Sequence, residues 1–291
     1  MKERKMICAD RFYPSSREMC LSELEKMFHS VNNHKIETGI FGAIVPHAGW
    51  VFSGKVSAEV FEAIFSSTGE IDTFIIFGAC HCGLARSPII YDGNRWQTPI
   101  GYCKIDQDIS MQISDAAQGL QVDNFIHEAE HSIEVNIPIL KYRFPDSQIV
   151  PIIVPPGNFE ELSSVIGSVI KKNKDKKIAV IGSTDLTHYG DDYRFTPKGD
   201  GEKGFLWAKN VNDKHLITYI EKLDSKNAVK EANSNKSACG PGAIGATIST
   251  CKFLGAEKAV TLRHTHSRDI MKAKYNSESS NSVGYAGIIF T

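Results

Sequence analysis

The chain has 291 residues, 42% of them hydrophobic, which is enough to bury a sizeable core. Its 33 Lys and Arg balance its 34 Asp and Glu, and the net charge of -1 excludes the basic excess that is typical of nucleic-acid-binding proteins. The N-terminus is charged and no apolar run approaches about 18 residues, so we expect no signal peptide, no membrane span and a cytoplasmic location.

Seven cysteines are scattered along the chain, and none of them belongs to a CxxC pair. An odd number of cysteines in a chain of this size is typical of a reduced, cytosolic protein rather than one stapled by disulfides. Without CxxC, the sequence also argues against a zinc ribbon, a thioredoxin-type redox pair and a three-cysteine iron–sulfur motif.

Apolar strand patterns alternate with helical patterns along the chain. A first helix is expected to follow a cap at Ser15 or Ser16 and to reach about Phe28. Its apolar face is predicted to contain four residues: Met19, Leu24, Met27 and Phe28. A buried strand is predicted at residues 41–46, and the helix behind it is expected to start at Ser53.

The middle of the chain is expected to begin with a buried strand at residues 73–79. Residues 87–93 and 97–105 favour an antiparallel pair around Asp92 and Gly93. Helices are predicted at residues 108–118, 130–144 (interrupted or ended near Pro138), 159–173, 204–223 and 242–255. Further strands are predicted at residues 147–155, 176–184, 258–266 and 283–290, with residues 266–282 as the most loop-like segment.

This alternation predicts an α/β fold with a central, mostly parallel sheet that is flanked by helices on both faces. The strands are uninterrupted apolar runs, as expected for a sheet that is buried on both sides. Because neither a repeat nor a linker-like change of composition occurs, we expect a single domain over residues 1–291.

Three histidines follow strand candidates directly: His47, His81 and His188, with Asp185 three residues before the last. In open α/β sheets, ligands bind beyond the carboxyl ends of the strands. A lone histidine in such a place is more often a turn or packing residue. Three at equivalent positions favour a shared site, provided that their strands run parallel.

Two further segments carry groups that bind metals. Cys239 precedes a helical run, where the helix dipole favours the thiolate form that binds metal ions. His131 and Glu134 are three residues apart and would share a helix face, although exposed pairs with this spacing are common. Cys80 and Cys82 flank His81, and they would point away from it in an extended chain, whereas a turn would change this. Two histidines and one anionic ligand are typical of non-haem Fe(II) sites, and a thiolate shifts the preference towards Cu(I) or zinc.

A histidine that does not bind the metal is a candidate general acid or base. His188, oriented by Asp185, suits this role, and the alternative is that Asp185 caps a turn.

Five segments resemble, in order, the motifs of the Memo-like family, also known as AmmeMemoRadiSam system protein B: PHAGWVFSG, GACHCG, EHSIEVNIPIL, GSTDLTHYG and ACGPGAIGA. The resemblance implies a fold similar to the catalytic subunit of class III extradiol ring-cleaving dioxygenases. It implies His47, His81 and Cys239 as metal ligands. It also implies a pocket that contains Asp185 and His188, with His131 nearby. Cys239 stands in place of the dioxygenase glutamate, which argues against classical ring cleavage.

The function that the resemblance implies is a redox metalloprotein with Fe(II) as the first choice of ion, then copper, then zinc. Its substrate is a small molecule or peptide that the resemblance does not identify, and its implied partners are a radical SAM protein and an AMMECR1-like protein. Two other functions stay open: a non-catalytic metal-binding or protein-interaction module, and a zinc hydrolase with the same ligands. A pocket that stays empty is the remaining alternative.

Overall fold

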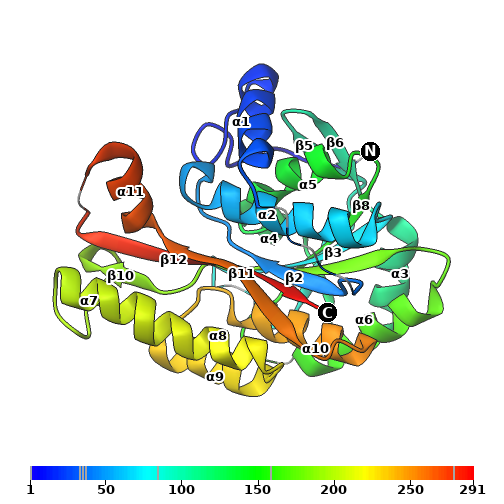
Figure 1. Cartoon of the computed structure of the whole chain (residues 1–291). Helices are drawn as coiled ribbons and strands as arrows, with labels where there is room; N and C mark the ends of the chain where they lie inside the picture. Colours follow the sequence, from blue (N-terminus) through cyan, green and yellow to red (C-terminus); the bar gives the residue numbers. More distant parts are fainter. Residues whose placement is uncertain are drawn as a thin grey trace.

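Four parallel strands form the centre of the main sheet (Figure 1). In spatial order they are β2 (Gly42–Val45), β9 (Ile178–Ser183), β3 (Thr73–Gly78) and β8 (Gln148–Ile153). The computed structural model describes residues 2–32, 34, 36, 38–83, 85–157, 159–277 and 279–291. The predicted fold class, an α/β fold with a mostly parallel central sheet, is confirmed.

Further strands extend this sheet at both edges. Beyond β2 lies β12 (Asn281–Phe290), which pairs antiparallel with β2 and also with β10 (His188–Gly190) and β11 (Ala259–His266). Beyond β8 lie β4 (Ile89–Ile90) and β7 (Gln121–Val122). A separate small sheet contains β1 (Glu3–Arg4), β5 (Arg95–Thr98) and β6 (Gly101–Lys104).

Both faces of the main sheet are buried under helices. Along β3, Phe74 and Ile76 pack into one hydrophobic layer, whereas Ile75 and Phe77 pack into the other. The first layer is covered by α1 (Arg17–His29), α2 (Trp50–Thr68) and α5 (Ile137–Arg143) (Figure 1). The second is covered by α3 (Gln107–Ala116), α6 (Phe159–Lys172), α8 (Asp213–Glu221), α9 (Ser225–Asn235) and α10 (Pro241–Leu254).

The remaining helical segments are short or lie at the surface: α4 (Asn124–Ala129), the 3-10 turns Glu134–Asn136 and Asp191–Tyr193, α7 (Glu202–Trp207), the π-helical turn Ala208–Asn212 and α11 (Ser267–Tyr275). Within the described residues, no helix combines the length and the apolar character that a membrane crossing requires.

The first two helices differ from the prediction in detail. Ser16 caps α1 as expected, but Met19 is 60% exposed, because α1 buries only the narrow stripe of Cys20 and Leu24. The second helix begins at Trp50 rather than Ser53, and Gly49 is its N-cap.

The predicted antiparallel pair around Asp92 and Gly93 is wrong. Strand β4, within residues 87–93, joins the main sheet beside β8, while β6 pairs with β5 in the small sheet. The hairpin turn lies instead at Pro99 and Ile100, where Thr98 pairs with Gly101 and the latter has a φ of 116°.

Two other predicted boundaries need correction. Pro138 does not interrupt a helix but lies at the start of α5, where its missing N–H is not needed. Residues 266–282 are not simply a loop, because they contain α11. This helix has no fully buried residue and therefore no apolar stripe that a sequence pattern would reveal.

A buried ion pair ties the N-terminus to the segment that leads into α5. Arg4 Nη1 lies 2.5 Å from Glu134 Oε2, and the two side chains are 1% and 2% exposed. Arg4 also donates hydrogen bonds to the carbonyl oxygens of His127 and Glu130. Glu134 in turn accepts hydrogen bonds from the backbone N–H of Cys8 and from other groups of this N-terminal segment. This network fixes residues 127–134, which carry part of the candidate site.

Replacing Glu134 by Ala should lower the free energy of unfolding by about 3–5 kcal/mol, because it leaves the Arg4 guanidinium buried without a counter-charge. Urea unfolding followed by circular dichroism measures this change. The matched control is Glu160→Ala, which removes an exposed pair with Lys226 and should cost less than about 1 kcal/mol. Equal losses for the two variants would contradict this account of the ion pair.

Candidate metal centre

The candidate site lies where the parallel strands end. His47 follows β2 by two residues, His81 follows β3 by three, and Asp185 follows β9 by two. Because β9 pairs in parallel with both β2 and β3, these three ends lie at one edge of the sheet. His188 begins β10 near the same edge, so the convergence expected from the sequence is present.

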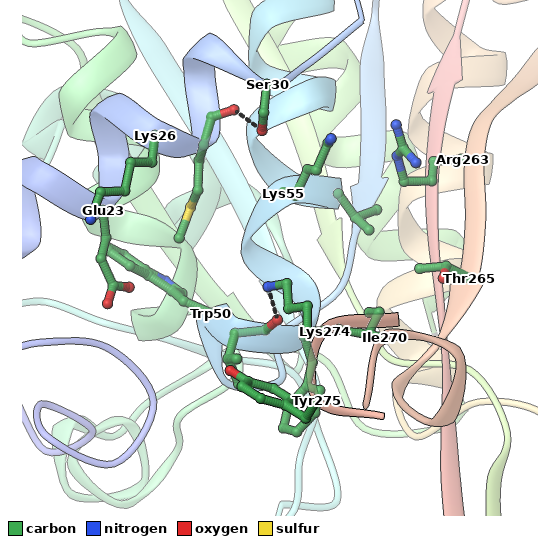
Figure 2. A pocket seen from close by; sticks show the side chains of 14 residues that line it. Glu23, Lys26, Ser30, Trp50, Lys55, Arg263, Thr265, Ile270, Lys274 and Tyr275 are labelled. Atoms are coloured by element: carbon green, nitrogen blue, oxygen red, sulfur yellow. Dashed lines mark hydrogen bonds between the residues drawn. The ribbon is translucent and has the colours of Figure 1, made fainter. Parts of the chain in front are cut away.

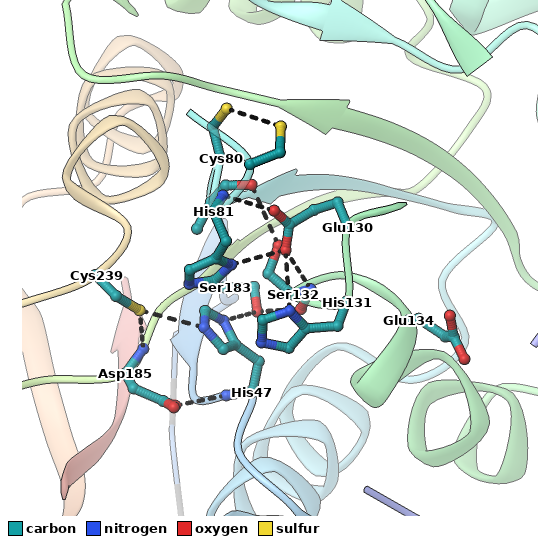
Figure 3. A network of polar contacts seen from close by, with 12 residues as sticks. His47, Cys80, His81, Glu130, His131, Ser132, Glu134, Ser183, Asp185 and Cys239 are labelled. Atoms are coloured by element: carbon teal, nitrogen blue, oxygen red, sulfur yellow. Dashed lines mark hydrogen bonds and ion pairs between the residues drawn. The ribbon is translucent and has the colours of Figure 1, made fainter. Parts of the chain in front are cut away.

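Three imidazoles gather at this edge (Figure 3). His47, His81 and His131 each offer one ring nitrogen, and these atoms lie within 4.8 Å of one another. The ring of His81 stacks on that of His131 with centroids 4.5 Å apart, and both present an edge or face to His47 at 5.1 and 5.3 Å. His131 therefore belongs to the cluster itself, rather than only to its surroundings.

Cys239 contacts the cluster from the side of α10. Its Sγ lies 3.2 Å from His47 Nε2 and accepts a hydrogen bond of 3.3 Å from the Asp185 backbone N–H. The following helix approaches closely, since a Cβ on Gly242 would lie 2.2 Å from the Val154 carbonyl oxygen. Because Gly242 has no side chain, the start of α10 can lie against the strand ends, and this places the Cys239 thiol beside His47.

Ser183 fixes the tautomer of His47. Its hydroxyl donates to the carbonyl oxygen of Ser132 at 2.6 Å, so it accepts the hydrogen from His47 Nδ1 at 3.0 Å. The lone pair of His47 is then on Nε2, facing Cys239. Burial, reinforced by the positive charge of His81, holds the pKa of His47 well below its usual range, which keeps this lone pair free.

Glu130 holds His81 by two atoms. Its Oε1 accepts from the ring Nδ1 at 2.8 Å and its Oε2 accepts from the backbone N–H at 2.7 Å. The N–H of Ser132 adds a third hydrogen bond. A carboxylate behind a ligating histidine is a recurrent feature of metal sites, because it orients the ring and leaves Nε2 to the ion.

The same contacts set the charges. Burial disfavours the charged forms of both Glu130 and His81. Even so, their mutual hydrogen bonds hold the pKa of Glu130 at about 2, and bonds to Cys239 and Glu130 raise the pKa of His81 to about 10. The pKa of His131 is shifted in the opposite direction from that of His81, because burial and the charge of His81 lower it to about 4.

Sequence patterns missed Glu130 and selected Glu134 in its place. Residues 130–133 are not helical, so the three-residue spacing from His131 to Glu134 does not bring these side chains together. Glu134 points away from the cluster towards Arg4 (Figure 3). A carboxylate directly beside His131 was the only signal for Glu130 in the sequence.

Asp185 and His188 do not form the predicted pair. The Asp185 carboxylate accepts from the His47 backbone N–H at 2.7 Å, so it caps the turn after β2, which was the alternative interpretation. Burial raises the pKa of this carboxyl to about 7. His188 is oriented instead by the Leu186 carbonyl oxygen, 3.0 Å from its Nδ1, and burial lowers its pKa.

A cavity of about 490 Å³ opens beside the cluster. Its walls include four residues of the predicted site: His47, His131, Asp185 and His188. Aromatic side chains such as Tyr285 complete the lining. Its size and its mixture of aromatic and titratable groups fit a small organic molecule.

A second cavity of about 500 Å³ lies between α1, α2, β11 and α11 (Figure 2). Cationic side chains line it, among them Lys55, Arg263 and Lys274, with Trp50 and Tyr275 beside them. None of the predicted site residues reaches this cavity, and the described residues of its lining include no histidine or cysteine.

Asp213, His264 and His266 form a second cluster with metal-binding side chains. Both histidines hold Asp213 Oδ2 at 2.8 Å, and Thr187 occupies Oδ1 through its N–H and its hydroxyl. Burial disfavours the charged carboxylate, yet the two histidines hold the pKa of Asp213 below its usual range. These donors already occupy both oxygens, so the cluster is complete as a buried polar network.

Comparison with known proteins identifies relatives along the whole chain. A family model described as Memo-like protein matches residues 4–289. The chain is 31% identical to a MEMO1 family protein of Nitrosopumilus maritimus, with 99% of each chain covered. It is 30% identical to one from Pyrococcus furiosus, with 98% of each covered, and 32% identical to one from Methanosarcina barkeri, with 98% of this chain and 99% of the relative covered.

Metal affinity at the histidine cluster should rise with pH, because an ion must displace the proton that His81 holds up to a pKa of about 10. Anaerobic Co²⁺ titrations between about pH 6 and 9 should show a gain of at least about tenfold per pH unit. Glu130→Gln removes the carboxylate that stabilises the charged ring, so the slope should flatten while affinity at high pH falls about 10–100-fold. An unchanged slope in this variant, as expected for the exposed control Glu160→Gln, would contradict the assignment.

Proposed function

The chain belongs to the family of Memo-like proteins, and from this premise we propose that it is a metal-binding redox protein. His47, His81 and Cys239 are the proposed ligands, with iron as the first choice of ion and copper as the second. The observation that carries the proposal is the orientation of the two histidines. Ser183 and Glu130 occupy their Nδ1 atoms and thereby direct both Nε2 atoms towards the same space.

The donor set fits a borderline transition metal. Two imidazole nitrogens and one thiolate are ligands that iron, copper and zinc accept, and His131 lies within reach as a fourth. An iron or copper ion at this place would supply a redox centre next to a cavity of about 490 Å³. Because Cys239 replaces a carboxylate of the extradiol dioxygenases, the proposed chemistry is not classical ring cleavage.

His188 is the proposed acid–base group. The contact of its Nδ1 with the Leu186 carbonyl oxygen places the hydrogen on Nδ1, so Nε2 carries the lone pair. The lowered pKa keeps the ring neutral at neutral pH, and His188 lines the cavity. It can therefore accept a proton from a substrate bound there. Asp185 is proposed as a positioning residue, since its carboxylate holds the His47 turn.

A second candidate function is a non-catalytic metal-binding module. The observation that favours it is the thiol of Cys239, 3.2 Å from His47 Nε2, because a thiolate binds Cu(I) tightly. In this role the protein would hold or deliver the ion, with a radical SAM protein and an AMMECR1-like protein as the proposed partners.

Metal content distinguishes the histidine cluster from the second cluster. After anaerobic purification, the wild type should contain about one equivalent of iron or copper, and the triple variant His47→Ala, His81→Ala, Cys239→Ala should lose it. The control His264→Ala, in the Asp213 cluster, should keep it. Elemental analysis by mass spectrometry measures both. Retention of the metal by the triple variant would overturn the ligand assignment.

Two measurements separate the enzyme from the module. For the enzyme, we expect oxygen consumption with catechol-like compounds and weak competition against a Cu(I) chelator. In Cys239→Ser, the thiolate-to-metal absorption band of the iron- or copper-loaded protein should disappear while binding falls about 10–100-fold. Tight Cu(I) binding without oxygen consumption would instead favour the module, and a band that persists in Cys239→Ser would exclude the sulfur as a ligand.

A further inference from the structure

Cys80 and Cys82 lie on either side of His81 in a turn after β3. In an extended chain, the side chains of neighbouring residues alternate, and both thiols would point away from His81 while standing well apart. The turn brings them together instead, and their Sγ atoms are 3.7 Å apart (Figure 3). The turn, which the sequence left open as the alternative to an extended chain, is the one that the structure has.

These thiols are also accessible. All seven cysteines are free, and four of them are buried in the core. The other three are partly exposed: Cys80, Cys82 and Cys239. Cys80 and Cys239 line a common cavity of about 240 Å³, so a small reagent can reach the pair from the side of the metal centre.

We propose that Cys80 and Cys82 are a reversible dithiol–disulfide site whose oxidation withdraws His81 from the metal centre. The regulatory part of this inference rests on the proposed function, because it requires that His81 binds an ion. The modification itself rests only on the two thiols.

The geometry permits a bond with little movement. A disulfide needs its sulfurs about 2.05 Å apart, so the Sγ atoms must approach by about 1.7 Å. The ring that closes contains the whole backbone of His81, so its φ and ψ angles change with the redox state of its neighbours.

The proposed oxidant is a small-molecule disulfide. The thiolate of one cysteine attacks a sulfur of the reagent, forming a mixed disulfide and releasing one small thiol. The second cysteine attacks the protein sulfur of that mixed disulfide and releases the other small thiol. The two protein thiols lose two electrons and two protons, and the reagent disulfide gains them as two thiols. A dithiol reductant reverses the steps.

The effect on the metal centre follows from the two hydrogen bonds between Glu130 and His81. Its two oxygens hold the ring Nδ1 and the backbone N–H of His81 in one arrangement, with the thiols apart. Closing the ring shifts the backbone N–H and the Cα of His81 relative to this carboxylate. The Nε2 atom then leaves its place opposite His47, and losing such an oriented ligand weakens metal binding by about tenfold or more.

Peptide mapping tests the modification. Trypsin cleaves after Lys55 and Arg86 and releases residues 56–86, which contain both thiols and no other cysteine. After treatment with oxidised glutathione, this peptide should be lighter by two hydrogens, and a dithiol reductant should restore its mass. If it carries only mixed disulfides or remains unmodified, the proposal is overturned.

Anaerobic Co²⁺ titration of the full chain tests the consequence, with an ion that does not itself oxidise thiols. Oxidised wild type should bind at least about tenfold more weakly than reduced wild type, whereas Cys82→Ser should bind equally well before and after treatment. Equal affinity of the two wild-type forms, or equal weakening of Cys82→Ser, would overturn the control of His81. If reduced wild type does not bind the ion at all, the proposed function fails, while the peptide masses still report separately on the disulfide.

Discussion

The parallel pairing of β9 with both β2 and β3 is the constraint on which the site depends. In this register, Val45 lies beside Ser183 and Phe77 beside Gly182, so the three strands end at the same level. The chain turns there, and the groups that follow meet although His47 and Asp185 are 138 residues apart. The order of the strands therefore brings the candidate ligands to one end of the sheet, and the turns determine how their side chains are oriented.

Glu130 links this edge of the sheet to the core. Its carboxylate fixes His81, and its own carbonyl oxygen is held by the buried guanidinium of Arg4. The positive charge of Arg4 is balanced by Glu134, which also accepts hydrogen bonds from the N-terminal segment. The two-residue strand β1 at the N-terminus thus supports His81, the candidate ligand that follows β3. A loss of packing around Arg4 would therefore disturb the candidate metal centre through two hydrogen bonds, from Arg4 to the Glu130 carbonyl oxygen and from His81 to the Glu130 carboxylate.

Sequence patterns predicted the parts of this structure that depend on burial. The central strands are continuous apolar runs, so their ends, and with them His47 and His81, could be found without coordinates. Helix α11 was not predicted because none of its residues is fully buried. Glu130 was not predicted because residues 130–133 form an irregular turn, which has no repeating sequence pattern. The three-residue spacing that is typical of a helix indicated Glu134 instead. The contact between Cys80 and Cys82 escaped for the same reason.

The charge of the ligand cluster bears on the ion that it prefers. Burial lowers the pKa of His47 and His131, whereas the pKa of His81 is about 10, so among the three histidines it is His81, opposite Glu130, that carries the extra proton and its positive charge. A bound ion must displace this proton and supply an equal positive charge to the buried carboxylate. A divalent ion with a thiolate from Cys239 does so, because the pair has one positive charge in total. Cu(I) with the same thiolate is neutral and leaves Glu130 unbalanced. Within the proposed function, this charge balance is an argument for a divalent ion such as Fe(II) over Cu(I).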